Sequence, residues 1–174
     1  DNDEMLAERI FPNYRGAYID LTKYDNVHDS KDAAPLEGAR FTLYQYNEDS
    51  GTWTASADDV TSEDGTLRFT VTDGEIYAVD ETAMPAGYNG AGLEGVWTDL
   101  QDEKVEAQQI TVAGTGGEPE TATVYPVNGS EPLEAGRSYR YNAYNIPHVP
   151  MEIRKQNVDG SAPAPTATVS VYEM

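Results

Sequence analysis

The segment TLRFTVTDGEIYAVDET, residues 66–82, carries two runs in which apolar and polar side chains alternate. In the first run, Leu67 and Phe69 stand two positions apart, and in the second run Tyr77 and Val79 do the same. The sequence Thr-Asp-Gly, which favours a turn, separates the two runs. A period of two places successive side chains on opposite faces of an extended chain. The segment therefore predicts two β-strands joined by a tight turn.

Short strands of the same kind are expected along the rest of the chain. We predict them at residues 17–24, 39–46, 52–55, 108–113, 121–127 and 137–146. Only residues 4–11 have a helical pattern, and it lasts for about two turns. Fifteen glycines and ten prolines interrupt the sequence throughout. Many short strands separated by turns are typical of an all-β sandwich.

The charge of the chain excludes several classes of partner. Its 31 acidic and 11 basic residues give a formal net charge of −20. Such a surface repels nucleic-acid phosphates and anionic lipid, so we expect neither nucleic acid nor membrane as a partner. The chain has no cysteine, which excludes disulfides and thiolate zinc sites. Its acidic clusters lack the spacing of a calcium loop, so we expect no metal and no cofactor.

An internal repeat suggests that the chain contains parts of more than one module. Asn13 precedes Lys23, and Asn145 precedes Lys155, by the same ten residues. The sequence after the first lysine, APLEGARFTLY, is echoed after the second as APAPTATVSVY. The period is about 130 residues, which is the size of a domain. We therefore predict a linker or the tail of a preceding module at 1–16, one β-sandwich at 17–147 with an insertion at 89–136, and the first strands of a following similar module at 148–174.

Three polar residues fall in phase with the apolar faces of their strands. Lys23 follows Leu21 at a spacing of two, and Glu81 follows Val79 in the same way. Asn145 continues the face of the last strand, which holds tyrosines and an alanine. An amine, a carboxylic acid and a carboxamide are thus all expected to point into the core. Burying any one of them without a partner would be costly, so we expect them to meet.

Two interpretations of this set remain open on the residues alone. Burial lowers the pKa of a lysine and raises that of a glutamate. A neutral Lys23 amine could then attack the side-chain carbonyl of Asn145, with a protonated Glu81 moving the protons while ammonia leaves. Such a reaction would run once, needs no cofactor and depends on the proximity that folding creates. The other interpretation is a buried Lys–Glu ion pair with the asparagine hydrogen-bonded beside it.

Each of two positions in this set has a neighbouring rival. A register shift of one residue would bring Asp80 into the core in place of Glu81. Asn142 could replace Asn145, although it falls in phase with Arg140 on the opposite face.

Four segments of the chain resemble a known family. They are IDLTKYD (19–25), APLEGARFTLYQY (34–46), SEDGTLRFTV (62–71) and YAVDETAMPAGYNG (77–90). They are similar to the SpaA-type pilin domains and the collagen-adhesin B-type (Cna B-like) domains of Gram-positive surface proteins. The resemblance is strong over 17–88 and at 139–147, and weak across 89–136. It implies an Ig-like, prealbumin-like antiparallel β-sandwich.

The resemblance also implies roles for the three polar residues. In that family the first strand ends in a reactive lysine, a glutamate before Pro-x-Gly-Tyr is catalytic, and the last strand supplies an asparagine that often precedes proline. The matching positions here are Lys23, Glu81 and Asn145. The resemblance thus implies an internal Lys–Asn isopeptide bond, formed in a single turnover by a protein that is otherwise not an enzyme.

The function implied is that of a structural stalk module in a cell-surface adhesin or pilin-like protein. Its partners would be neighbouring domains of the same extracellular, cell-wall-anchored parent protein, with the anchor elsewhere in that protein. The segment VYPVN (124–128) resembles the pilin motif whose lysine is joined to the next subunit, but Val127 occupies the lysine position. This favours a single-chain multidomain adhesin over a polymerising shaft. The alternative is a domain that binds a host glycan or protein of the extracellular matrix through the 89–136 insertion.

Overall fold

The computed structural model describes residues 16–26, 31–85, 87–88, 96–113 and 118–145. Within these ranges the chain forms nine strands and a single 3-10 turn, η1, at Val127–Ser130. The strands are β1 (Ala17–Tyr24), β2 (Arg40–Asn47), β3 (Thr52–Val60), β4 (Thr66–Val71), β5 (Tyr77–Ala83), β6 (Val96–Thr98), β7 (Gln108–Ala113), β8 (Pro119–Pro126) and β9 (Ser138–Tyr144). The expected segments at 4–11 and 148–174, together with Asn13 and Lys155, lie outside the described residues.

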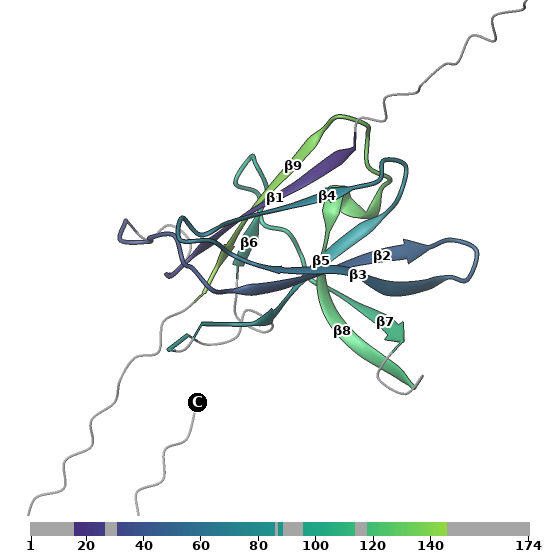
Figure 1. Cartoon of the computed structure of the whole chain (residues 1–174), viewed down its shortest axis with the longest axis horizontal. Coiled ribbons are helices and arrows are strands. Elements are labelled where there is room, and N and C mark those ends of the chain that lie inside the picture. Colours follow the sequence, from purple (N-terminus) through teal and green to yellow (C-terminus); the bar gives the residue numbers. More distant parts are fainter. Residues whose placement is uncertain (1–15, 27–30, 86, 89–95, 114–117, 146–174) are drawn as a thin grey trace, which may run out of the picture.

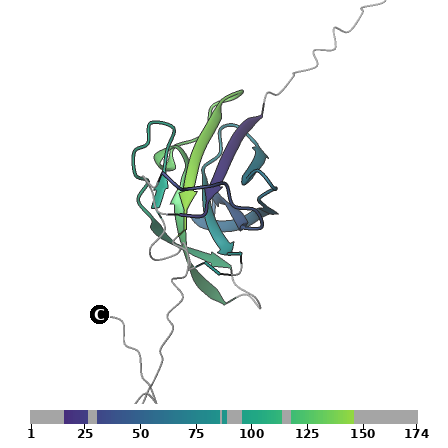
Figure 2. The ribbon, with the colours of Figure 1, turned by 90° about the vertical axis from the view of Figure 1, so that its left-hand side faces the viewer.

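The strands form two layers (Figure 1). One layer is a four-stranded sheet in the order β4-β1-β9-β6, and the other is a small closed barrel in the order β2-β3-β7-β8-β5. Strands β1 and β9, the first and last of the described chain, run side by side in the four-stranded sheet (Figure 2). They are parallel, so β1 begins and β9 ends at opposite ends of that sheet.

The main core lies between the four-stranded sheet and strands β2 and β5. In β1 every second residue is buried, beginning with Ala17 and Ile19. Strands β4 and β9 alternate in the same way. Phe41 of β2 and Val79 of β5, both fully buried, close the core from the other layer. The alternation in the sequence is thus the pattern of one buried face and one outer face.

A second, smaller core fills the barrel. It is formed by Tyr44, Ala78, Ile110 and Val124, with Trp53 packed against them. A bulge between β2 and β3 at this point breaks the register next to Tyr44. Because successive side chains of a strand point to opposite faces, the consecutive β2 residues Leu43 and Tyr44 are buried one in each core.

The predicted fold class, an all-β prealbumin-like sandwich, is confirmed, with three differences in detail. Strand β3 continues to Val60, beyond the predicted end at residue 55, and the sequence missed this part because its residues are exposed and show no alternation. Strand β6 has three residues, which is too short for a periodic pattern. The β1–β9 pairing is parallel, and so is the single bridge between β3 and β7.

The predicted insertion at 89–136 contributes several of these elements. β6 pairs with β9 at the edge of the four-stranded sheet. β7 and β8 pair with each other, and β8 joins β5 to close the barrel. The described part of this region is therefore packed against the sandwich through two sheets.

Candidate functional site

The structure brings together Lys23, Glu81 and Asn145 in the main core. Lys23 comes from β1 and Asn145 directly follows β9, the neighbouring parallel strand. The backbone N–H of Asn145 donates to the carbonyl oxygen of Tyr24 at 3.2 Å, so the pairing of the two strands continues to this residue. Glu81 comes from β5 in the opposite layer, where it pairs with Phe41.

The carboxyl group of Glu81 accepts a hydrogen bond from each of the other two side chains. Nζ of Lys23 donates to Oε2 of Glu81 at 2.9 Å. Nδ2 of Asn145 donates to Oε1 of the same carboxyl group at 3.0 Å. Lys23 and Asn145 are fully buried, and the side chain of Glu81 is inaccessible to solvent. One carboxyl group therefore bridges an amine and a carboxamide inside the protein.

Burial dominates the electrostatics of this group. It lowers the pKa of Lys23 to about 8, although the charge of Glu81 and its hydrogen bond act in the opposite direction. Burial also raises the pKa of Glu81, against the effect of the Lys23 charge and of the two hydrogen bonds. Both shifts favour the neutral amine and the neutral acid, because a low-dielectric interior disfavours charge. Attack on an amide carbonyl requires a neutral amine as the nucleophile, and a neutral acid can supply the proton that the leaving group needs.

The two rival residues lie elsewhere. Asp80 pairs with Thr42 and, by alternation, faces away from Glu81, toward the barrel. Burial, followed by the charge of Glu81, raises the pKa of Asp80 to about 6. Asn142 lies on the outer face of the four-stranded sheet, among the residues that line a surface hollow.

The sequence did not assign Gly65 or Trp97 to this part of the core. Gly65 contacts the backbone of Lys23. Trp97 of β6 is 1% exposed and stacks on Tyr125, with ring centroids 4.3 Å apart. It also makes an edge contact with Phe41 at 5.7 Å. The glycine occurs in a turn sequence that gives no hint of tertiary contact, and the tryptophan lies in a strand too short to predict.

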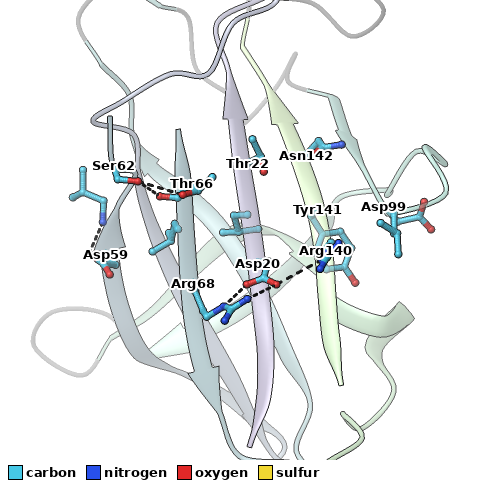
Figure 3. A pocket seen from close by; sticks show the side chains of 14 residues that line it. Asp20, Thr22, Asp59, Ser62, Thr66, Arg68, Asp99, Arg140, Tyr141 and Asn142 are labelled. Atoms are coloured by element: carbon cyan, nitrogen blue, oxygen red, sulfur yellow. Dashed lines mark hydrogen bonds and ion pairs between the residues drawn. The ribbon is translucent and has the colours of Figure 1, made fainter. Parts of the chain in front are cut away.

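A hollow of about 720 Å³ lies on the outer face of the four-stranded sheet (Figure 3). On its floor Asp20 accepts two hydrogen bonds from Arg68, at 2.6 and 3.1 Å, and lies 3.8 Å from Arg140 on the other neighbouring strand. Val60 and Leu100, 37% and 63% exposed, stand among the lining residues. The three charged residues occupy matching positions on β4, β1 and β9, so they tie these strands together from the outside.

The family model for the SpaA prealbumin-like fold domain matches residues 18–114, more than half of the chain. The chain belongs to this family. The match includes Lys23 and Glu81. In the SpaA-type module described here, the strand that carries Asn145 lies beyond the matched residues but pairs directly with the matched β1.

Solved structures of Gram-positive pilus proteins are similar to this SpaA-type module in fold. The minor pilin GBS52 of Streptococcus agalactiae is 14% identical, with a TM-score of 0.42, over 82% of this chain and 49% of the pilin. The pilus adhesin RrgA of Streptococcus pneumoniae is 20% identical, with a TM-score of 0.45, over 79% and 16%. The shaft pilin SpaA of Lactobacillus rhamnosus GG is 17% identical, with a TM-score of 0.43, over 76% and 51%.

The SpaA-type module thus spans about half the length of the two pilins and a smaller share of the adhesin. No curated protein matches the sequence. In the described part of the module, no helix has the length and apolar character that a membrane span requires.

Proposed function

We propose that this module bears load in a Gram-positive cell-surface adhesin or pilin-like protein, and that it forms an isopeptide bond between Lys23 and Asn145. The observation that carries the proposal is the single carboxyl group of Glu81, which contacts both the amine and the carboxamide in a buried site. A surface ion pair would need no such arrangement. A buried charged pair is itself costly, whereas an amide bond would leave no charge on the lysine.

The reaction balances without any other reactant. Nζ of Lys23 attacks Cγ of Asn145, the Nζ–Cγ bond forms, and the Cγ–Nδ2 bond breaks. Glu81, as the neutral acid, gives its proton to Nδ2, which leaves as ammonia, and takes a proton from Nζ in its place. The hydrogen bonds from Nζ and Nδ2 to the two oxygens of Glu81 are the path that this transfer needs. Glu81 ends in the protonation state in which it began, so the module reacts once and is not a turnover enzyme.

The position of the bond suggests its mechanical role. Tension on the two ends of the module would act on β1 and β9, which are parallel neighbours. A bond from Lys23 to Asn145 would pass this tension directly from one strand to the other. By analogy with loop closure by a disulfide, it would also stabilise the fold by about 4–5 kcal/mol.

The wider context is part of the same proposal. We place the module at residues 17–147, between segments of neighbouring modules, in an extracellular protein anchored to the cell wall. Neighbouring domains of the parent protein are its expected partners. Val127, at the position of the pilin lysine, is 1% exposed and packs in the main core. A buried valine there supports an adhesin-like chain more than a polymerising shaft, and the packed strands of 96–136 favour a structural role over a ligand-binding loop.

Intact mass tests the proposal. The purified chain should weigh one ammonia less than its sequence, and Lys23→Ala, Glu81→Ala and Asn145→Ala should each restore the full mass and lower the melting temperature. Lys31→Ala, at an exposed lysine, and Asn142→Ala, on the outer face, are the matched controls and should keep the deficit. A full mass for the unmodified chain would show that the site is only an ion pair.

A further inference from the structure

Three buried side-chain atoms in the described part of the chain lack a hydrogen-bond partner: Nε1 of Trp97, Oγ1 of Thr98 and Oδ1 of Asn145. Trp97 and Thr98 belong to β6, and Asn145 directly follows β9, the strand that pairs with β6. A buried polar atom without a partner costs free energy. Such atoms are rare in folded proteins, and catalytic function is one explanation for them. Here one of the three is the oxygen of the carboxamide that is proposed to react.

Strand register makes Trp97 a diagonal neighbour of Asn145. Ala143 of β9 pairs with Lys23 on one side and with Trp97 on the other. Asn145 is the next residue on the same face as Ala143. Lys23 and Trp97 are therefore its diagonal neighbours from the two flanking strands, a relationship that long and aromatic side chains can bridge.

Packing holds the indole ring in position. Trp97 is stacked on Tyr125 with an interplanar angle of 11° and contacts the edge of Phe41. Phe41 in turn pairs with Glu81 across β2 and β5. The ring thus lies among the residues that surround the site, and its nitrogen can only donate a hydrogen bond. The unpartnered oxygen of Asn145 can only accept one.

We propose that the Trp97 indole N–H donates a hydrogen bond to Oδ1 of Asn145 as Lys23 attacks. This inference rests on the Lys23–Asn145 reaction proposed above. Formation of the Nζ–Cγ bond moves an electron pair of the carbonyl onto Oδ1, and the indole N–H stabilises the resulting negative charge. The carbonyl re-forms when the Cγ–Nδ2 bond breaks and ammonia leaves. Lys23, Glu81 and Trp97 then each serve a different atom of one carboxamide: Cγ, Nδ2 and Oδ1.

The rate of crosslinking tests this role. The full chain is made by cell-free synthesis, samples are quenched in denaturant at intervals, and the fraction lacking one ammonia is read by intact mass. Trp97→Phe keeps an aromatic ring but removes the N–H. We expect it to slow crosslinking by at least about tenfold, since loss of one donor to a developing oxyanion typically costs about 10²–10³ in rate. Trp53→Phe, in the barrel core, is the matched control and should react at the rate of the unmodified chain.

A second measurement needs no change at Trp97. The chain has two tryptophans, so a nitrogen-15 spectrum contains two indole N–H signals. The Trp97 signal should lie further downfield and exchange with water more slowly in the crosslinked chain than in Lys23→Ala, while the Trp53 signal stays unchanged. A Trp97 signal with the same shift and exchange in both proteins would overturn the proposal, even if Trp97→Phe fails to fold.

The outcomes separate this proposal from the one that it rests on. If the unmodified chain loses ammonia and Trp97→Phe crosslinks equally fast, the indole role is wrong and the isopeptide proposal stands. If the unmodified chain keeps its full mass, both proposals are wrong.

Discussion

Gly65 lies directly against the backbone of Lys23. Its carbonyl oxygen accepts the N–H of Lys23 at 2.8 Å. A Cβ atom at position 65 would lie 2.8 Å from the carbonyl oxygen of Lys23 and equally close to the backbone nitrogen of Leu36. Gly65 also has a φ of +69°, which other residues rarely adopt. The end of β1 that carries the proposed nucleophile can therefore approach the turn before β4 only because residue 65 has no side chain.

Gly65→Ala should displace Lys23 as well as destabilise the fold. We expect the free energy of unfolding to fall by about 1–3 kcal/mol, measured with Asn145→Ala in both proteins so that no crosslink forms. With Asn145 intact, crosslinking should be slower. Gly74→Ala is the matched control, because Gly74 has a φ of +80° but no atom within 4 Å of its Cβ position. Equal effects of the two substitutions on crosslinking would contradict the contact argument.

Glu81 and Asp80 are adjacent carboxylates on opposite faces of β5, so they should differ in chemistry. Glu81→Gln keeps the shape of the side chain but cannot exchange protons as an acid, and it should block or greatly slow the loss of ammonia. Asp80→Asn should leave crosslinking intact, because Asp80 lies on the opposite face of β5 from Glu81 and faces the barrel, away from Lys23 and Asn145. Intact mass distinguishes the two variants, and the reverse result would place the wrong carboxylate in the site.

Asp80 should instead affect stability in a pH-dependent way. Its pKa is raised to about 6 in the folded protein, against about 3.9 in an unfolded chain. Between these values the folded state holds a proton that the unfolded state releases, so the free energy of unfolding falls as pH rises from about 4 to about 6 and stays lower above that range. Asparagine cannot ionise. Asp80→Asn should therefore be more stable than the parent at pH 7, by on the order of 1 kcal/mol once solvent screening is allowed for.

The two proteins should have similar stability near pH 4, where Asp80 is protonated in the folded state. Melting temperatures at the two pH values, measured with Asn145→Ala in both proteins, check the sign of the effect. A stabilising effect of equal size at both values would mean that ionisation of Asp80 is not its cause.

Much of the fold could be predicted because alternation is strong in the strands that line the main core. In β1 and β9 the apolar residues mark one face, and Lys23 and Asn145 belong to that face by spacing alone. Glu81 follows Tyr77 and Val79 in the same way, and these three are buried on β5. A buried face shared by three strands is sufficient to expect that their polar residues meet.

Other features depend on pairing between strands, which periodicity does not encode. The parallel course of β1 and β9 follows from the topology of the whole sheet. The barrel that β7 and β8 complete with β2, β3 and β5 depends on a single bridge at Trp53 and two pairs beside Tyr125. Trp97 is a diagonal neighbour of Asn145 because Val96–Thr98 pairs with the end of β9, and three residues are too few to show a pattern.

A pulling experiment should distinguish the crosslinked module from a folded module without the bond. Because β1 and β9 are parallel neighbours, tension applied through the two ends of the chain acts on both strands in opposite directions. With the proposed bond in place, the roughly 120 residues between Lys23 and Asn145 carry no load, so the module should not release their length, about 400 Å when extended. Lys23→Ala should release that length when it unfolds. Single-molecule force spectroscopy on the full chain measures the difference, and Lys31→Ala should behave like the parent. Release of about 400 Å from a chain whose mass shows the ammonia deficit would mean that the bond joins residues other than Lys23 and Asn145.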